Sequence, residues 1–295
     1  MRVLLFGANG FLGGPVRDRL AAEPGVEVIT AGRSAAADLR ADLTTIGATA
    51  LAEVLRKASP HAVLNCAGVT GGDPAGLVAG NVVAVAALTS AMLRSAPAAR
   101  LVHFGSAGEY GRVARGVSVH ESAEAKPLHA YGVTKLAGTE LVRAAREHEG
   151  LDAVVLRVFN PIGPGAPDGT LPGRLAALLR KGSPITVGPL DAYRDFVDSR
   201  DVAEATVAAA IAPGTLPPVL NVGTGSAILL RDLAKELGSI AGSGAGIAES
   251  GHGSERSADV PWQQADVSAI REALGWSATR SLTTSLTDLW VAAGG

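Results

Sequence analysis

The sequence predicts an α/β fold: a doubly wound parallel sheet with a smaller second lobe interleaved toward the C-terminus. Three observations predict it, namely short apolar runs, longer helix-like stretches that alternate with them, and a glycine loop directly after the first run. Apolar strands that alternate with helices indicate a parallel sheet covered on both faces. Because crossovers between parallel strands are right-handed, the doubly wound arrangement is the natural solution.

The expected elements follow from these runs in chain order. Strands are expected at residues 3–6, 26–30, 62–65, 101–104, 153–158 and 219–222. Helices are expected at residues 13–22, 49–58, 77–95, 131–147 and 202–212. From residue 160 the alternation loosens and proline and glycine become more frequent. We therefore expect residues 1–159 to form the first domain, with 199–222 returning to it, and residues 160–198 and 223–295 to form mainly the second lobe.

Composition limits the possible functions. With 295 residues, 47% apolar and 18% charged, the chain is long enough and apolar enough to bury a core. Its net charge of -2 gives no electrostatic reason to expect a nucleic acid or a membrane surface as partner. The single cysteine, Cys66, excludes an internal disulfide, and no Cys/His cluster has the spacing of a metal site. The six scattered histidines are expected to be surface or packing residues.

No export signal is expected, because the first apolar run is too short and leads into glycines. Residues 74–93 have the length of a membrane span, but Pro74, Gly76, Gly80 and Asn81 interrupt them, so we expect a buried helix. These features favour a cytoplasmic protein.

Tyr131 and Lys135 are the most informative pair in the chain. Their spacing of four places both side chains on one face of a helix, about one turn apart. A free phenol has a pKa of about 10, and an ammonium about 4 Å away lowers it by roughly three units at an effective dielectric near 20. Such a phenol suits general acid–base work near neutral pH. Ser106, at the end of an apolar run, is a second hydroxyl that this site could use.

The first glycine loop indicates a dinucleotide site. Gly7, Gly10 and Gly13 follow a strand directly and open a helix, where glycines allow a pyrophosphate to approach the helix N-terminus. A plain glycine-rich turn is the alternative, and the position between strand and helix favours the dinucleotide.

The end of the second expected strand carries Arg33 and no acid. A guanidinium suits the 2′-phosphate of NADP, whereas an acid would bind the 2′-hydroxyl of NAD, so NADP is expected and NAD remains possible. Asp42 and Leu43 are expected near the adenine. Residues 1–159 would then be a Rossmann-type NADP-binding domain, and the second lobe would bind substrate.

A series of ordered motifs over nearly the whole chain resembles the extended short-chain dehydrogenase/reductases, the nucleotide-sugar epimerase/dehydratase/reductase family. The motifs are Gly7-x-x-Gly10-x-x-Gly13, Asn65-Cys66-Ala67-Gly68, Asn81, residues 106–111, Tyr131-x-x-x-Lys135, residues 157–163, residues 194–203, Asn221-Val222-Gly223, Arg256-x-x-Asp259-Val260 and Leu274-Gly275-Trp276.

The resemblance assigns roles to individual residues. It implies that Tyr131 is the acid/base, that Lys135 binds the nicotinamide ribose and lowers the pKa of the tyrosine, and that Ser106 hydrogen-bonds the reacting oxygen. Further cofactor contacts are implied for Asn9, Phe11, Leu12, Cys66, Ala67, Gly68, Asn81, Pro161 and Ile162, beside the three glycines. Substrate contacts are implied for Ser106, Gly108, Glu109, Asn160, Arg194 and Arg256, with the two arginines on a diphosphate.

The residues after Ser106 separate the reactions of the family. Ala107 and Gly108 cannot supply the acid–base pair of a dehydratase, and Gly108 cannot supply the cysteine of a 3,5-epimerase-reductase. A 4-keto-6-deoxyhexose reductase is favoured by Arg33 and by the resemblance of residues 188–196 to the reductases, in particular those acting on GDP-linked sugars. A 4-epimerase, a reductase of another small carbonyl and a catalytically silent NADP-sensing protein remain alternatives. A homodimer is expected through the apolar helices near Asn81 and Tyr131.

Overall fold

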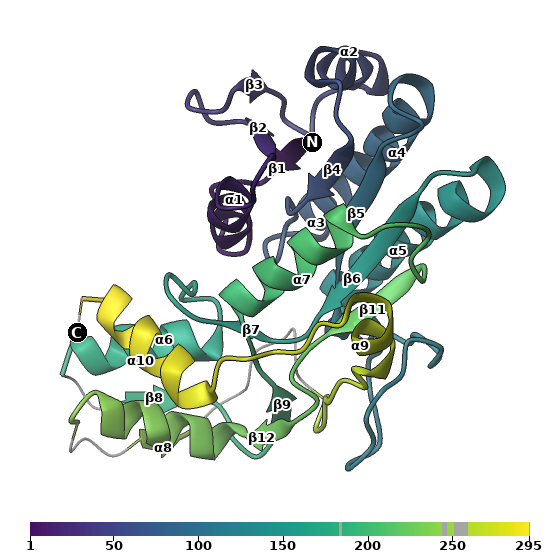
Figure 1. Cartoon of the computed structure of the whole chain (residues 1–295). Helices are drawn as coiled ribbons and strands as arrows, with labels where there is room; N and C mark the ends of the chain where they lie inside the picture. Colours follow the sequence, from purple (N-terminus) through teal and green to yellow (C-terminus); the bar gives the residue numbers. More distant parts are fainter. Residues whose placement is uncertain (183–184, 244–246, 251–258, 295) are drawn as a thin grey trace.

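The computed structural model describes residues 1–182, 185–243, 247–250 and 259–294. Its centre is a parallel seven-stranded sheet in the order β11-β6-β5-β4-β1-β2-β3 (Figure 1). The strands are β1 (Arg2–Phe6), β2 (Glu27–Gly32), β3 (Leu39–Arg40), β4 (Ala62–Asn65), β5 (Arg100–Ser106), β6 (Ala153–Val158) and β11 (Val219–Val222). The predicted doubly wound fold is confirmed. Because the strand order reverses between β1 and β4, a crevice opens at their carboxyl ends, where ligands bind in such sheets.

Helices cover both faces of the sheet. On one face α1 (Gly13–Ala21) packs against α7 (Ser199–Ile211); on the other α2 (Ala48–Ala58) packs against α4 (Ala84–Ser95), which contacts α5 (Ala130–Glu149). Two apolar cores result, one on each side of the sheet.

The long apolar helix begins earlier than expected. Asp73 accepts a hydrogen bond from the Gly76 amide and starts α3 (Pro74–Val78), which continues through a π-helical turn, η1 (Ala79–Val83), into α4. Among the described residues this is the one helix that is long and apolar enough to cross a membrane. Half of its most apolar window is buried, and it packs between α2 and α5, as a core helix does.

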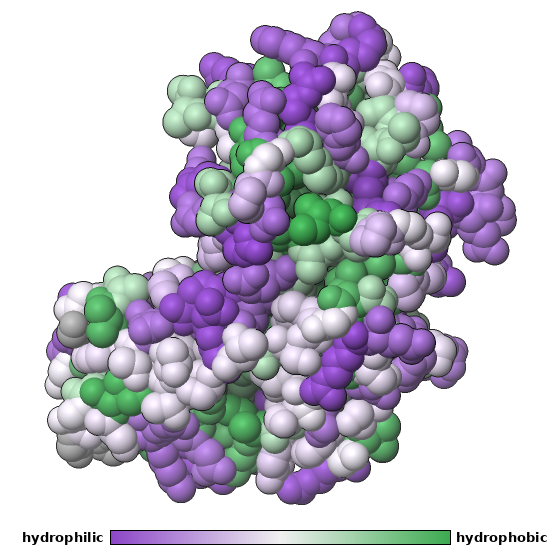
Figure 2. Space-filling model, viewed as in Figure 1, coloured by the Kyte–Doolittle hydropathy of each residue, from purple (hydrophilic) through white to green (hydrophobic). Residues whose placement is uncertain are grey.

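The second lobe is assembled from separate stretches of chain around a third apolar core. Its short sheets pair β7 (Pro161–Ile162) with β10 (Val197–Asp198), β9 (Tyr193–Asp195) with β12 (Ala227–Leu229), and β8 (Ile185–Val187) with β13 (Ile247–Glu249). Its helices are α6 (Leu171–Arg180), α8 (Leu230–Ile240) and α10 (Leu282–Ala292). In Figure 2 this lobe projects from the sheet domain, whose surface mixes hydrophilic and hydrophobic residues.

One C-terminal element lies with the sheet domain. Helix α9 (Ser268–Leu274) packs against β11 and α7, and Ile270 and Trp276 belong to the core on that face. The C-terminal part of the chain therefore divides between the sheet domain and the second lobe.

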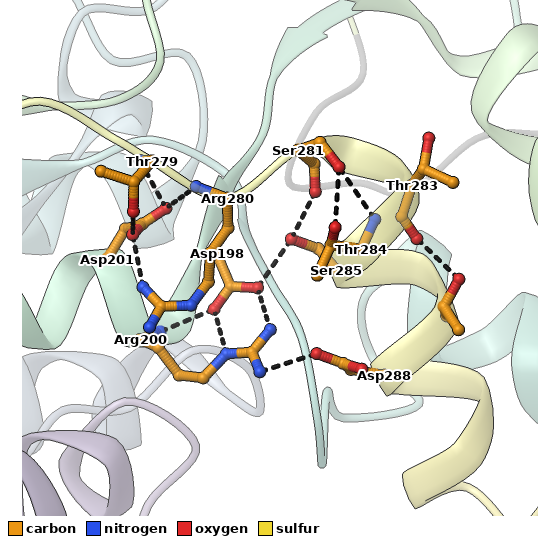
Figure 3. A network of polar contacts seen from close by, with 11 residues as sticks. Asp198, Arg200, Asp201, Thr279, Arg280, Ser281, Thr283, Thr284, Ser285 and Asp288 are labelled. Carbon is orange, nitrogen blue, oxygen red and sulfur yellow. Dashed lines mark hydrogen bonds and ion pairs between the residues drawn. The ribbon is translucent and has the colours of Figure 1, made fainter.

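A polar network joins the lobe to the start of α7 (Figure 3). Asp198 accepts a hydrogen bond of 2.6 Å from Ser285 of α10. Arg200 forms an ion pair of 2.7 Å with Asp288, which is also on α10. Asp201 accepts hydrogen bonds from Thr279 and Arg280 in the segment before that helix. These contacts hold α10 against the sheet domain.

Candidate active site

A cavity of about 590 Å³ lies at the carboxyl ends of β1, β2 and β4. Nine of the residues expected to contact the cofactor line this cavity. The predicted cofactor residues on it are Gly7, Asn9, Gly10, Arg33, Asp42, Leu43, Cys66, Ala67 and Gly68. Phe11, Leu12 and Gly13 are the end of the glycine loop and the start of α1, and they do not line the cavity.

The glycine loop fits a dinucleotide by its geometry. Gly7 has a φ of +80°, and a Cβ there would lie 2.7 Å from the Ala67 amide nitrogen. A Cβ on Gly13 would lie 1.9 Å from the Gly7 carbonyl oxygen, so the helix can approach the strand this closely only with glycine. The start of α1 is therefore held against Gly7, which lines the cavity, and a helix N-terminus so close to the cavity favours a pyrophosphate. The residues present fit the expected cofactor.

The far wall of the cavity is basic. Arg33 lies on it as predicted, and Arg17 of α1, which the sequence analysis missed, lies on it too. Asp18 holds the Arg17 guanidinium with two hydrogen bonds of 2.8 and 3.0 Å. Hydrogen bonds from Thr44 hold the pKa of Asp42 below its usual value, and Arg33 contributes in the same direction. The helical position of Arg17, after the glycine loop, is the signal that could have found it.

A second cavity, of about 220 Å³, lies between the carboxyl ends of β5 and β6 and the second lobe. Of the predicted residues, its wall contains Ser106, Gly108, Tyr131, Asn160, Pro161 and Arg194. His129 and Gln263, which were not predicted, also line it. Ile162 points into the core of the lobe instead and is buried there. Arg256 lies outside the described residues.

The position of Glu109 differs from the expected substrate contact. Its side chain is fully buried, and it does not line the cavity, so it cannot contact substrate as expected. One carboxylate oxygen accepts the Ser106 amide at 2.8 Å, and the other accepts Arg157 Nε at 2.7 Å. The Arg157 guanidinium also lies 4.6 Å from the centroid of the Tyr110 ring. Glu109 therefore fixes the backbone that presents Ser106, whose hydroxyl accepts the Gly108 amide at 3.1 Å.

Lys135 lies beneath both cavities without lining either. Its side chain is buried and its ammonium donates a hydrogen bond to the Phe104 carbonyl. The ammonium lies 3.8 Å from the position of a Cβ on Gly68, a residue of the cofactor cavity. Burial lowers the pKa of Lys135 to about 8, although the Glu109 carboxylate acts in the opposite direction.

Asn81 also supports the site without lining a cavity. It is buried in the π-helical turn, outside the lining of the cofactor cavity, so the expected direct contact is replaced by support of the loop. Its side chain exchanges hydrogen bonds of 2.9 and 2.8 Å with the Val69 amide and carbonyl, and donates to Thr134 at 3.1 Å. Asn81 thereby joins the loop after β4 to α5, the helix of Tyr131.

The lobe side of the second cavity is built on buried polar contacts. Asn160 Nδ2 donates to the Asp195 carbonyl and to Gln263 Oε1, both at 3.0 Å. Asp195 itself accepts hydrogen bonds from Thr224 and from the Ala265 amide. Arg194 is 4% exposed, and burial lowers its pKa to about 10. A guanidinium at this depth suits an anionic group of the substrate.

The two cavities lie at the same edge of the sheet, and Ser106 and Tyr131, each of which carries a hydroxyl, line the second. Two hydroxyl donors are suited to stabilise negative charge that develops on a carbonyl oxygen. Among the described residues no group of three His, Cys, Asp or Glu side chains could hold a metal ion.

Comparison with known proteins agrees with this geometry. Residues 3–223 match the NAD dependent epimerase/dehydratase family. The chain belongs to this family. Its fold, its enzymatic nature and its dependence on a nicotinamide dinucleotide are thereby confirmed.

Individual proteins similar to the chain include two enzymes that act on nucleotide-linked 6-deoxy sugars by name, and one solved structure. The dTDP-6-deoxy-L-talose 4-dehydrogenase (NAD(P)(+)) of Kitasatospora kifunensis is 36% identical over 99% of this chain and 95% of its own. GDP-6-deoxy-D-mannose reductase of Pseudomonas aeruginosa is 31% identical over 62% of this chain and 64% of its own. The structure of RMD from Pseudomonas aeruginosa complexed with NADPH has a TM-score of 0.85 and 25% identity, covering 99% of this chain and 98% of that one.

Proposed function

We propose that the protein uses NADPH to reduce the 4-keto group of a nucleotide-activated 4-keto-6-deoxyhexose. The observation that carries this proposal is the placement of Ser106 and Tyr131 on a cavity wall beside the dinucleotide crevice, with the Lys135 ammonium beneath. NADPH supplies the hydride when bound. Tyr131 donates the proton to the carbonyl oxygen, Ser106 donates a hydrogen bond to the same oxygen, and Lys135 stabilises the ionised phenol that is left.

The wall of the second cavity favours a 6-deoxy sugar. Leu128, Leu171, Pro172, Phe196 and Val260 present apolar surface there. Such a wall suits a methyl group at C6 better than a hydroxymethyl group, which would lose hydrogen bonds to water. Both relatives carry 6-deoxy sugars in their names, one dTDP-linked and one GDP-linked. Arg194 would hold the diphosphate.

The basic wall of the first cavity favours NADP(H). Arg33 and Arg17 both line the cavity where the adenosine ribose would lie, and forked guanidinium groups suit a 2′-phosphate. The NAD(P)(+) in the name of the Kitasatospora relative is consistent with use of either cofactor.

The test is a panel of GDP-, dTDP-, UDP- and CDP-linked 4-keto-6-deoxyhexoses, each mixed with the enzyme and NADPH while the absorbance of the reduced nicotinamide is followed. We expect consumption with one or two sugars, which names the base. The same nucleotides linked to sugars without a keto group are the controls. No consumption with any keto-sugar would contradict the proposal.

A 4-epimerase with tightly bound NAD(P) is the second candidate, because the family description includes epimerases and the same two hydroxyls could serve oxidation and re-reduction of C4. If the protein is an epimerase, a sugar in the panel should change its configuration at C4 without net consumption of NADPH.

We further propose a homodimer. Val78, Val83 and Val133, on α3, η1 and α5, are each more than 40% exposed. These helices pack against one another, so a second copy could cover their apolar residues. Sedimentation of the purified protein tests this, and a monomer at micromolar concentration would contradict it.

A further inference from the structure

His129 lies on the wall of the second cavity, the one lined by Ser106 and Tyr131, although the sequence analysis expected a surface or packing residue. It occupies the position just before α5 in extended backbone, with φ of -129° and ψ of 155°. Tyr131 follows two residues later and lines the same cavity. Two residues of chain span at most about 7 Å, so the backbone of His129 lies within that distance of Tyr131, on the wall that both residues line.

The character of the wall limits what this imidazole can bind. No carboxylate is found among the residues described as lining the cavity, so an amino sugar has no counter-charge there. Asn160 Nδ2 and Thr170 are engaged in hydrogen bonds that build the wall itself. A single imidazole nitrogen can donate a hydrogen bond to a sugar hydroxyl or accept one from it.

We propose that His129 is a specificity residue that hydrogen-bonds a ring hydroxyl next to the reacting carbon of the sugar. This inference rests on the proposed function, because Ser106 and Tyr131 must take the oxygen of the reacting carbon for the neighbouring hydroxyl to reach His129. In this proposal the residue at the start of α5 selects the sugar, and Arg194 on β9 holds the diphosphate.

The test compares His129→Phe and His129→Asn with the wild-type enzyme. His129→Phe keeps a planar ring without hydrogen bonds, and His129→Asn keeps a donor and an acceptor. With the keto-sugar that the panel identifies, we expect kcat/KM to fall about tenfold in the phenylalanine variant, as for one lost hydrogen bond, and to recover in large part in the asparagine variant. His148→Phe, an exposed histidine at the other end of the same helix, is the matched control and should leave kcat/KM unchanged.

Binding measurements separate this inference from the proposed function. By calorimetry, His129→Phe should weaken binding of the nucleotide sugar about tenfold and leave the affinities for the nucleoside diphosphate and for NADPH within about twofold. Equal loss for the diphosphate, or no loss for the sugar, would overturn the role of His129. If the wild-type protein binds no nucleotide sugar, the inference and the proposed function both fall. If the wild type reduces a keto-sugar and both variants match it, only the inference falls.

Discussion

At the scale of single residues, the candidate site combines side chains at two depths: Ser106 and Tyr131 line the cavity, whereas Lys135 and Glu109 are buried. Tyr131 and Lys135 were predicted from a spacing of four, and the structure places the phenol on the cavity wall and the ammonium beneath it. Glu109 was expected to contact substrate, yet it pairs with Arg157, which comes from a strand 48 residues away. His129 was missed because only the assembled fold places it on a cavity wall, whereas the helical position of Arg17 after the glycine loop could have indicated its place.

Tyr131→Phe tests the catalytic assignment. Removing the hydroxyl removes the proton donor, so kcat should fall by at least about a hundredfold. The ring remains, so the Kd for NADPH should change by less than about threefold. Steady-state kinetics and a binding titration on the same preparation measure both, and a variant of near wild-type activity would refute the assignment.

Arg33→Ala and Arg17→Ala test the recognition of the 2′-phosphate. Loss of charge-assisted hydrogen bonds should weaken NADPH binding by about tenfold or more for each variant and leave NADH binding nearly unchanged. Arg56→Ala is the control, since Arg56 pairs only with Glu53 on the exposed side of α2 among the contacts described. Equal losses for NADPH and NADH would place the phosphate elsewhere.

Lys135→Met tests the cost of the buried ammonium. Burial lowers the pKa of Lys135 from 10.5 to about 8 in the folded protein. Between these values the unfolded chain binds more protons, so this group makes the free energy of unfolding rise with pH. The full difference corresponds to on the order of 3 kcal/mol. Urea unfolding of the cofactor-free protein should therefore give a rise from about pH 8 to about pH 10 in the wild type that is reduced in Lys135→Met. Parallel curves would show that the lysine is charged throughout.

At the scale of elements, the strands of the sheet were the most predictable part. All six expected strands lie in the sheet, because each is an apolar run bounded by turn residues. Strand β3 was missed since two residues carry no periodic pattern. Helices α6, α8 and α10 were not placed; glycine and proline surround α6, and glycine surrounds α8. Their formation depends on a shared core built from distant stretches of chain.

Gly13→Ala tests the tight contact between β1 and α1. The added methyl group would lie 1.9 Å from the Gly7 carbonyl oxygen, so the loop or the helix must move. We expect NADPH affinity to fall at least about tenfold, together with a loss of about 2 kcal/mol in the free energy of unfolding. Gly14→Ala is the matched control, because its methyl group would come no closer than 4.0 Å to the nearest atom. Equal NADPH affinity in the two variants would contradict the role of the loop.

At the scale of the whole molecule, the interleaving of the two lobes was predicted but the contacts that join them were not. Asp198 and Asp201 were recognised within a motif, yet their partners Ser285 and Arg280 lie about 80 residues further along the chain. No local sequence pattern predicts hydrogen-bonded pairs that lie so far apart in the chain. The network in Figure 3 ties α10 to α7 and so fixes the lobe that forms one side of the reacting cavity.

Asp201→Ala tests this junction. The buried carboxylate accepts hydrogen bonds from the backbone and side chains of Thr279 and Arg280, and its loss removes the one acceptor that these contacts share. We expect the free energy of unfolding to fall by about 3 kcal/mol in urea titrations. Glu53→Ala, which removes an exposed ion pair on α2, should cost less than about 1 kcal/mol. Equal effects of the two substitutions would show that the network does not stabilise the fold.

The transfer of deuterium from NADPH labelled on the nicotinamide tests the central claim most directly. With the sugar identified by the panel, the product of a reductase should carry one deuterium at C4, seen by NMR, in equal amount to the NADP⁺ formed. A product without deuterium at C4, or an altered sugar with the label still on the nicotinamide, would contradict the account.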